Sequence, residues 1–195
     1  MKGILAGFCI SIGAIIYLTI GGYMGAALFS MGLIAILAFG YELFTGKAGL
    51  LITREISVAN LLLVYMYNLM GATFCAIFVK YFLQDEELIN AATKVLENRN
   101  AQSFLVNLTK GAFCGSCMYI AVSGFKKTGN YLLAVVPVMV FILAGFNHSV
   151  ADMFYIGLAA SHISDYWSLI PTTIGNIIGA NFFGLNQLLE RNHER

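Results

Sequence analysis

The sequence has little charge and almost no proline, and both shortages limit what the chain can be. Only 11% of its 195 residues are charged, compared with roughly 25% in soluble domains. By contrast 59% are hydrophobic, and the mean hydropathy is +0.79. Two prolines are too few for a linker-rich or disordered protein, and a net charge of +1 gives no pull on nucleic acid. The composition indicates an integral protein of the lipid bilayer, with no nucleic-acid partner.

Long runs without ionisable charge mark the expected membrane-spanning helices, each of which needs about 20 apolar residues. The first run, residues 3–41, covers 39 residues and is long enough for two helices separated near Gly21 and Gly22. Further runs cover residues 57–79, 103–125 (interrupted by Lys110), 128–151 (with His148 neutral) and 166–189. The alternating pattern of a membrane barrel strand is absent. We therefore expect an all-α membrane protein with six transmembrane helices, forming a single transmembrane domain over residues 1–195.

The distribution of lysine and arginine predicts the orientation, because cytoplasmic loops carry an excess of both. With the N-terminus inside, the segments on that side contain Lys2, Lys47, Arg54, Lys126, Lys127, Arg191 and Arg195. The outer segments contain Lys94 and Arg99 beside an acidic cluster. The bias predicts a multi-pass protein of the cell membrane with both termini in the cytoplasm.

The chain contains a weak internal repeat. Residues 40–42 (Gly-Tyr-Glu) are echoed by residues 145–147 (Gly-Phe-Asn), 105 positions later. Residues 68–72 are echoed by residues 176–180, and Lys2-Gly3 by Lys110-Gly111, both 108 positions later. The halves, approximately 1–84 and 103–190, each hold three expected helices, so the second half would be inverted in the membrane. Inverted repeats place a transport site near the bilayer midplane; chance similarity between glycine-rich helices is the alternative.

Each half also contains a polar interruption inside an apolar helix. The second helix runs into residues 40–47 and resumes at Ala48, and the fifth runs into residues 145–152 and resumes at Met153. Non-helical backbone at membrane depth is tolerated only where protein or water satisfies its polar groups. We therefore expect a water-accessible path between two broken helices. Glu42 and Asp152 lie in the interruptions, where we expect carboxylates to cap the restarting helices.

Three motifs carry a family resemblance: residues 40–46, 144–154 (Ala-Gly-Phe-Asn-His-Ser-Val-Ala-Asp-Met-Phe) and 173–179 (Thr-Ile-Gly-Asn-Ile-Ile-Gly). Together they resemble the formate/nitrite transporter family, and the similarity extends in order over nearly the whole chain. The resemblance implies an aquaporin-like six-helix protomer in a homopentamer, with one pore per subunit. It also implies passage of small monovalent anions such as formate, nitrite or hydrosulfide, with a role for protons and without a cofactor or metal.

The same resemblance assigns roles to individual residues. It makes His148 the central pore histidine, with Thr45 and Asn176 as hydrogen-bonding groups near it. It matches Phe29, Leu33 and Leu43 to an inner constriction and Phe141 to an outer one. The sequence departs from the family pattern at Gly115, where asparagine is common, and at Asn147, where glutamate is common. It also begins with the first expected span, without the family's N-terminal cytoplasmic helix. These departures bear on gating and ion preference.

His148 is the strongest candidate for the chemistry of transport. A small anion faces a steep cost in hydrocarbon, and protonation removes most of that cost. Histidine is the side chain whose ordinary pKa lies nearest physiological pH. We hypothesise that His148 donates a hydrogen bond or a proton to the anion between two apolar rings that exclude water. The alternative is a histidine satisfied within the core. For Asn176, the alternative is helix packing beside Gly175 and Gly179.

Three basic residues are candidates for attracting anions to the outer mouth: Lys94, Arg99 and Lys110. For Lys94 and Arg99 the alternative is a solvated loop whose charge is offset by nearby acids. Lys110 lies inside an apolar run, where it would extend to the interface or pair with a carboxylate.

Two other functions remain open from the sequence. Cys114 and Cys117 have the C-x-x-C spacing of a redox pair or half a metal site, which would suit a membrane thiol oxidoreductase. They lie in an apolar helix with no second pair, and buried cysteine commonly acts as a small apolar side chain. An aquaporin-like channel for neutral solutes is less favoured, because the two prolines, Pro137 and Pro171, lie outside the interruptions. We expect a transporter rather than an enzyme.

Overall fold

The computed structural model describes residues 1–193, with side chains described for residues 1–185 and for Leu189. Over that range the secondary structure is helical and no strand occurs. The elements are α1 (Lys2–Ile20), α2 (Gly22–Phe39), α3 (Phe44–Lys47), the 3-10 turn η1 (Ala48–Leu50), α4 (Val58–Phe78), the π-helical turn η2 (Val79–Leu83), α5 (Glu86–Asn100), α6 (Phe104–Thr128), α7 (Tyr131–Leu143), α8 (Ser149–Ala159), the 3-10 turn η3 (Ile163–Tyr166) and α9 (Leu169–His193). The expected all-α class is confirmed.

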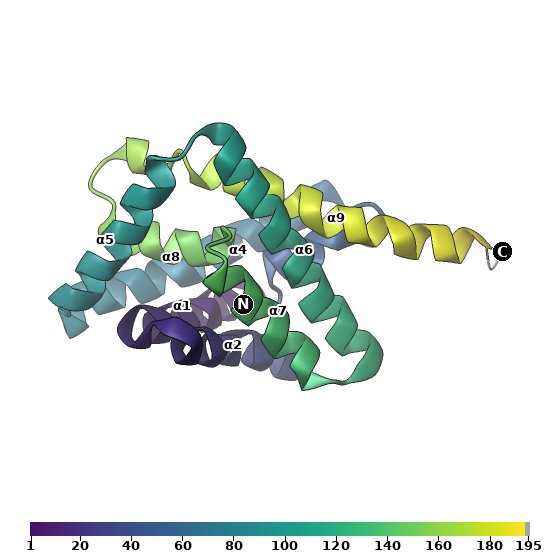
Figure 1. Ribbon diagram of the computed structural model, residues 1–195, viewed down its shortest axis with the longest axis horizontal. Coiled ribbons are helices and arrows are strands. Elements are labelled where there is room, and N and C mark those ends of the chain that lie inside the picture. The colour runs from purple at the N-terminus through teal and green to yellow at the C-terminus, as the bar shows by residue number, and fades with distance from the viewer. Residues whose placement is uncertain (194–195) are drawn as a thin grey trace.

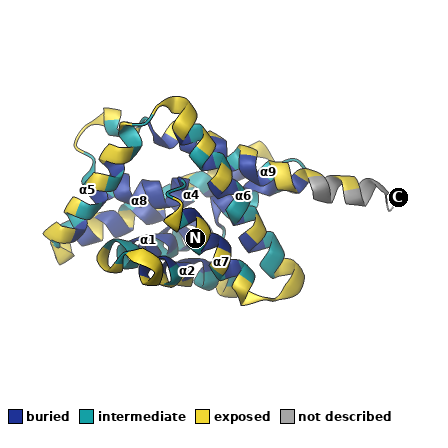
Figure 2. Cartoon of the chain, viewed as in Figure 1, coloured by how far each residue is buried: buried dark blue, intermediate teal, exposed yellow. Residues whose placement is uncertain are grey.

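Four of the described helices are long and apolar enough to cross a bilayer. They are α1, α2, α4 continued through η2, and α6, while α7 and α8 are shorter apolar helices. Large apolar side chains such as Phe74, Phe82 and Leu105 are exposed, and exposed residues alternate with buried ones along the same helices (Figure 2). Since such surfaces are costly in water, lipid or a further subunit must cover them.

The helices form two closely packed pairs, α1 with α4 and α6 with α9, and α2 and α7 pack on these and on each other (Figure 1). A Cβ atom built on Gly71 of α4 would lie 1.9 Å from the Ile4 carbonyl oxygen of α1. One built on Gly179 of α9 would lie 1.8 Å from the Ala112 carbonyl oxygen of α6. Backbones approach this closely in membranes only where the residue is small. Both contacts therefore depend on glycine.

Two interruptions lie where the sequence predicts them. α2 ends at Phe39, and its C-cap residue Gly40 has a left-handed φ of 63°; Leu43 is extended before α3 begins. After α7, Gly145 has a φ of 68°, and His148 is extended before α8 begins. Positive φ favours glycine at both bends. The predicted points of resumption, Ala48 and Met153, are wrong by four residues, because polar side chains continue into the first turn of each restarting helix.

The segment between η2 and α6, for which a solvated loop was one alternative, is the helix α5. Asp85 caps it, with Oδ1 accepting a hydrogen bond of 3.0 Å from the Leu88 amide. Leu88, Ala92 and Leu96 recur every four residues and are buried. α5 packs against α8 at one end of the molecule (Figure 1). An apolar stripe of this spacing forms one helix face, which the many charged residues around it obscure in the sequence.

Candidate functional site

His148 and Thr45 form a buried polar pair that joins the two interruptions. His148 is the N-cap residue of α8, and its Nδ1 accepts a hydrogen bond of 3.1 Å from the Ala151 amide. Its Nε2 lies 2.9 Å from Thr45 Oγ1, and both side chains are buried. Because Nδ1 accepts, the neutral ring carries its hydrogen on Nε2 and donates it to Thr45. The Thr45 hydroxyl hydrogen is then left to donate to another acceptor.

These hydrogen bonds distinguish between the two roles considered for His148, the donation of a hydrogen bond and the donation of a proton. Protonating Nδ1 would turn the acceptor for the Ala151 amide into a donor, and the N-cap bond of α8 would be lost. The geometry therefore favours His148 as a neutral hydrogen-bond donor, acting through Nε2 and the Thr45 hydroxyl.

Asn176 holds the second interruption in place. Its Oδ1 accepts a hydrogen bond of 2.9 Å from the Ser149 amide, the first of α8. Its Nδ2 donates to the carbonyl oxygens of Gly111, at 2.8 Å, and Asn147, at 2.9 Å. Both amide hydrogens are thus used, and none remains to donate to an anion. In this arrangement Asn176 positions the backbone beside His148.

Asn68 does the same for the first interruption. Its Oδ1 accepts from the Phe44 amide at 2.8 Å, and its Nδ2 donates to the carbonyl oxygens of Gly3, at 2.9 Å, and Glu42, at 2.8 Å. The sequence repeat contains Asn68, but no role was expected for it. The sequence signal for Asn68 is its exact match with Asn176, 108 positions later in the repeat.

Aromatic rings cover one side of the histidine. The Phe141 ring stacks on the His148 ring with centroids 5.4 Å apart. The Phe29 ring meets Phe141 edge to face at 5.9 Å. Leu33 and Leu43 are also buried. The resemblance groups Phe29 with Leu33 and Leu43, but in the structure Phe29 lies with Phe141.

Two cavities approach this cluster. One, here named the arginine cavity, has a volume of about 190 Å³ and is lined by Phe29, Phe141 and His148 together with Arg99 and Asp152. The other, named the lysine cavity, has a volume of about 230 Å³ and is lined by Leu43 and Gly46 together with Glu42, Lys47 and Lys126.

The two cavities meet different parts of α2. Phe29 lines the arginine cavity and Ile36 lines the lysine cavity, and a rise of 1.5 Å per residue puts about 10 Å between them. Leu33 lies between these two positions on the helix and is fully buried. Leu33 thus lies between the two cavities along α2. His148 lines the arginine cavity, and its partner Thr45 directly precedes Gly46 of the lysine cavity.

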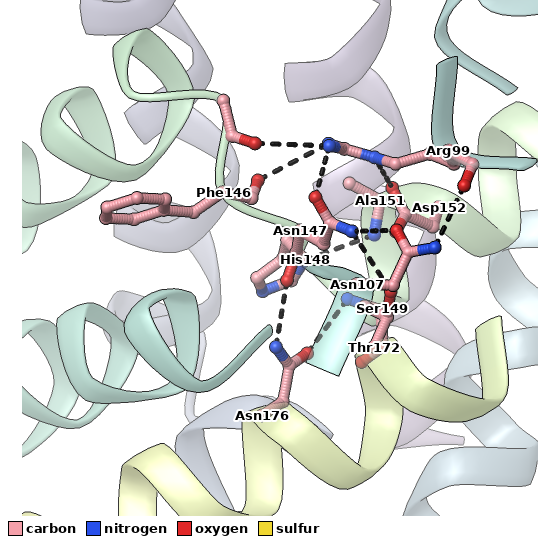
Figure 3. Close-up of polar contacts among 11 residues, drawn as sticks. Arg99, Asn107, Phe146, Asn147, His148, Ser149, Ala151, Asp152, Thr172 and Asn176 are labelled. Atoms are coloured by element: carbon pink, nitrogen blue, oxygen red, sulfur yellow. Dashed lines mark hydrogen bonds and ion pairs between the residues drawn. The ribbon is translucent and has the colours of Figure 1, made fainter. Parts of the chain in front are cut away.

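Arg99 reaches from α5 into the arginine cavity (Figure 3). It donates to the carbonyl oxygens of Gly145, at 3.2 Å, and Phe146, at 3.4 Å, and to Asn147 Oδ1. Its side chain is only 15% exposed. The alternative of a solvated loop residue is thus wrong for Arg99. The guanidinium instead satisfies the carbonyl groups that the break between α7 and α8 leaves open.

Asp152 lies in the first turn of α8 and faces Arg99. Its Oδ1 is 3.6 Å from Arg99 Nε, and its side chain is 6% exposed. The expectation that Asp152 and Glu42 cap the restarting helices is wrong. His148 caps α8 and Asn68 binds the first amide of α3, while Glu42 pairs with Lys47 at 2.7 Å.

Asn147 and Asn107 complete the network around Arg99. Asn147 Nδ2 donates to Asn107 Oδ1 at 2.7 Å, and Asn107 Nδ2 donates to the Arg99 carbonyl oxygen at 2.9 Å. Asn107 was not expected at the site. A fully buried asparagine in an apolar helix must find hydrogen-bond partners, and that requirement is the signal in the sequence.

The other two basic candidates lie outside the arginine cavity. Lys94 is exposed on α5, and Lys110 is half-buried on α6. The Lys110 carbonyl oxygen accepts a bond of 3.4 Å from the Asn147 amide. Within the described residues the Lys110 ammonium has no ion pair.

Cys114 and Cys117 form no disulfide and belong to no candidate metal site in the described part of the chain. Cys114 is buried and Cys117 half-buried on α6, and both are free thiols. Among the residues searched there, no three His, Cys, Asp or Glu side chains are grouped so that they could hold a metal ion.

The sequence is similar to known transport proteins. The profile of the formate/nitrite transporter family matches residues 1–188. An uncharacterized transporter of Bacillus subtilis, YrhG, is 33% identical over 188 residues, covering 86% of this chain and 71% of that protein. The formate channel FocA of Haemophilus influenzae is 27% identical over 231 residues, covering 92% and 81%.

Solved structures with the same fold are also found. One described as a pentameric formate channel with formate bound aligns with a TM-score of 0.82 at 23% identity, over 100% of this chain and 96% of that one. One described as an FNT family ion channel aligns with a TM-score of 0.85 at 22% identity, over 97% and 88%. The structures show a shared fold. The family profile and the related transport proteins confirm the resemblance carried by the three motifs, and with it a transport protein rather than an enzyme.

Proposed function

The chain belongs to the formate/nitrite transporter family, and from this premise we propose that it is a channel for small monovalent weak-acid anions. Formate, nitrite and hydrosulfide are the substrates of this type. The observation that carries the proposal is the buried His148–Thr45 pair, which lies among apolar residues near two cavities lined in part by charged side chains. Hydrogen-bond donors in an otherwise apolar passage suit a small solute that accepts hydrogen bonds and has shed its water.

The path of a solute follows the order of residues from the arginine cavity to the lysine cavity. A solute in the arginine cavity meets Phe29 and Phe141, whose rings exclude its hydration shell. The Thr45 hydroxyl, which receives the hydrogen of His148 Nε2, then donates to a solute oxygen or sulfur. Leu33 and Leu43 follow before the lysine cavity. Because a bare anion is costly among apolar groups, the species that passes these residues most easily is the neutral acid.

The architecture that we propose is one transmembrane domain of six spans, built as two inverted repeats over about 1–84 and 103–190. The matched bonds of Asn68 and Asn176 and the matched contacts of Gly71 and Gly179 support this division. α7 and α8 together then supply one span, interrupted at Gly145–His148. With three spans in each half, the halves have opposite orientations.

We further propose a homopentamer in the cell membrane with both termini in the cytoplasm. The pentamer is supported by the fold shared with a structure described as a pentameric formate channel. The orientation is supported by Lys47 and Lys126, which line the lysine cavity, because cytoplasmic segments carry an excess of lysine and arginine. The arginine cavity then opens to the outside.

The test is flux into proteoliposomes of formate, nitrite, hydrosulfide and chloride at about pH 5.5 and 7.5, a span around the ordinary histidine pKa. The wild type should pass weak-acid anions much faster than chloride. His148→Leu, which removes both the donor and the helix cap, should slow flux by roughly 10- to 100-fold, as expected for one lost hydrogen bond in a dry site.

His148→Asn is the matched variant, because asparagine also caps helices and donates a hydrogen bond. It should therefore keep more flux than His148→Leu. Selectivity for chloride, or equal flux through His148→Leu and the wild type, would overturn the proposed function.

A further inference from the structure

We propose that Asp152 takes up the proton that accompanies the anion, and that its protonation frees Arg99 to bind the anion in the arginine cavity. This inference rests on the proposed function and names the group that couples it to protons. It assigns to Asp152 the control of anion entry, and to His148 only the donation of hydrogen bonds.

The contact between the two side chains is incomplete. Asp152 Oδ1 and Arg99 Nε lie 3.6 Å apart, and within the described chain neither atom has a hydrogen-bond partner. Both residues line the arginine cavity beside His148. The terminal nitrogens of Arg99 donate to Gly145, Phe146 and Asn147, which uses three of the five N–H donors of the guanidinium. Nε, the donor that faces Asp152, is free to bind a carboxylate or a substrate anion.

Asp152 and the substrate compete for that donor, because formate and a carboxylate side chain have the same acceptor chemistry. With Asp152 ionised, an arriving anion would place two negative charges beside one guanidinium, and both side chains of the pair are largely buried. With Asp152 protonated, the anion replaces it as the counter-charge of Arg99. Each anion thus enters with one proton, and the net charge of the site does not change.

The proton balance closes within the cavity. A proton from the outer solution forms the O–H bond of Asp152, and the anion binds at Arg99. The Asp152 O–H bond then breaks as a new bond forms to the anion, which leaves as the neutral acid past Phe29 and Phe141. The Asp152 carboxylate returns to Arg99. No oxidant, metal or further reactant takes part.

The other groups around Asp152 are unsuited to this role. His148, on the same helix, uses Nδ1 as a helix-cap acceptor. Tyr155 of α8, Tyr65 of α4 and Cys114 of α6 are within electrostatic reach, and Tyr17 of α1 lines the cavity. Phenol and thiol groups are neutral at neutral pH. Arg99 of α5 is thus the charged partner that Asp152 faces in the described structure.

The experiment measures formate uptake and internal acidification in proteoliposomes from about pH 5.5 to 7.5. Wild-type uptake should fall about tenfold per pH unit, the slope of a single required proton. Asp152→Asn should vary less than about twofold over the same range. Asp152→Glu should restore the slope, and both His148→Asn and the exposed-site control Glu87→Gln should keep it.

A retained slope in Asp152→Asn, or a slope lost in His148→Asn alone, would overturn this inference and leave the proposed function standing. Absence of weak-acid flux in the wild type would instead overturn the proposed function, and this inference with it.

A second measurement needs no variant, in case Asp152→Asn fails to fold. The chain has three aspartates, Asp85, Asp152 and Asp165. Carbon-13 labelling of their carboxyl groups and solid-state NMR of the wild type in lipid should show one carboxyl becoming protonated when formate is added at about pH 6. Three carboxyl signals that remain ionised with formate present would also overturn the inference.

Discussion

Asn68 and Asn176 lie 108 positions apart and make the same three hydrogen bonds. Each side-chain oxygen accepts from the first amide of a helix that restarts after a break, Phe44 or Ser149. Each side-chain nitrogen donates to a carbonyl oxygen within the break and to a glycine carbonyl of a neighbouring helix. One buried amide thus satisfies two backbone groups at the break and ties them to a neighbouring helix. The two breaks depend on the same chemical solution.

Replacing either asparagine should destabilise the protein. Asn68→Ala and Asn176→Ala each leave the two buried backbone groups at the break without this partner, and we expect a loss of about 2–4 kcal/mol in the free energy of unfolding. Asn60→Ala, at an exposed site on α4, should change it by less than about 0.5 kcal/mol. Unfolding in detergent with a chemical denaturant measures all three. Equal stability of Asn176→Ala and Asn60→Ala would contradict the role given to Asn176.

Alanine at the glycine contacts should prevent the helices from pairing. The added Cβ would lie 1.9 Å from a backbone oxygen at position 71 and 1.8 Å from one at position 179. Because backbone cannot yield as a side chain does, we expect both Gly71→Ala and Gly179→Ala to abolish the folded protein. Gly124→Ala is the matched control, since its Cβ meets the end of the flexible Leu133 side chain at 3.2 Å. Size-exclusion chromatography in detergent, with circular dichroism, distinguishes the outcomes.

Thr45 should act through its hydroxyl group. Thr45→Val has nearly the same shape but leaves His148 Nε2 without its acceptor at 2.9 Å. We expect flux to fall about tenfold or more, because the loss of one buried hydrogen bond raises the barrier to passage. Thr45→Ser keeps the hydroxyl and should retain most of the flux. If valine and serine variants conduct equally, the hydroxyl does not contact the solute.

Asp165 gives a pH prediction outside the membrane-spanning helices. Its Oδ2 accepts hydrogen bonds of 2.9 Å from the amides of Ser161 and His162, and these bonds lower the pKa of the carboxyl. The folded pKa is therefore below the unfolded one. The loop gains stability above the unfolded pKa and loses it as the pH falls through the lowered folded value. Amide hydrogen exchange at Ser161 and His162 should accelerate in that acidic range, and Asp165→Asn should exchange rapidly at every pH.

Local features of the chain predicted much of this architecture. Charge-free runs long enough to span a bilayer marked the positions of the helices, because their apolar side chains are unfavourable in water at any position. Gly40 and Gly145 marked the two breaks, because the backbone there requires positive φ. The family motifs likewise singled out His148 and Thr45. Each of these signals lies within one short segment.

The remaining features depend on residues that are distant along the chain. Arg99 lies 53 positions before Asp152, and only the packing of α5 on α8 brings the two charges to the same cavity. Phe29 lies on the same side of His148 as Phe141, because the Phe29 ring contacts the Phe141 ring of α7. The charge-rich sequence of α5 resembles that of a solvated loop, and its apolar stripe is recognised as a buried helix face only from its packing against α8. Composition determines which segments enter the membrane, whereas contacts between those segments decide which polar groups meet inside it.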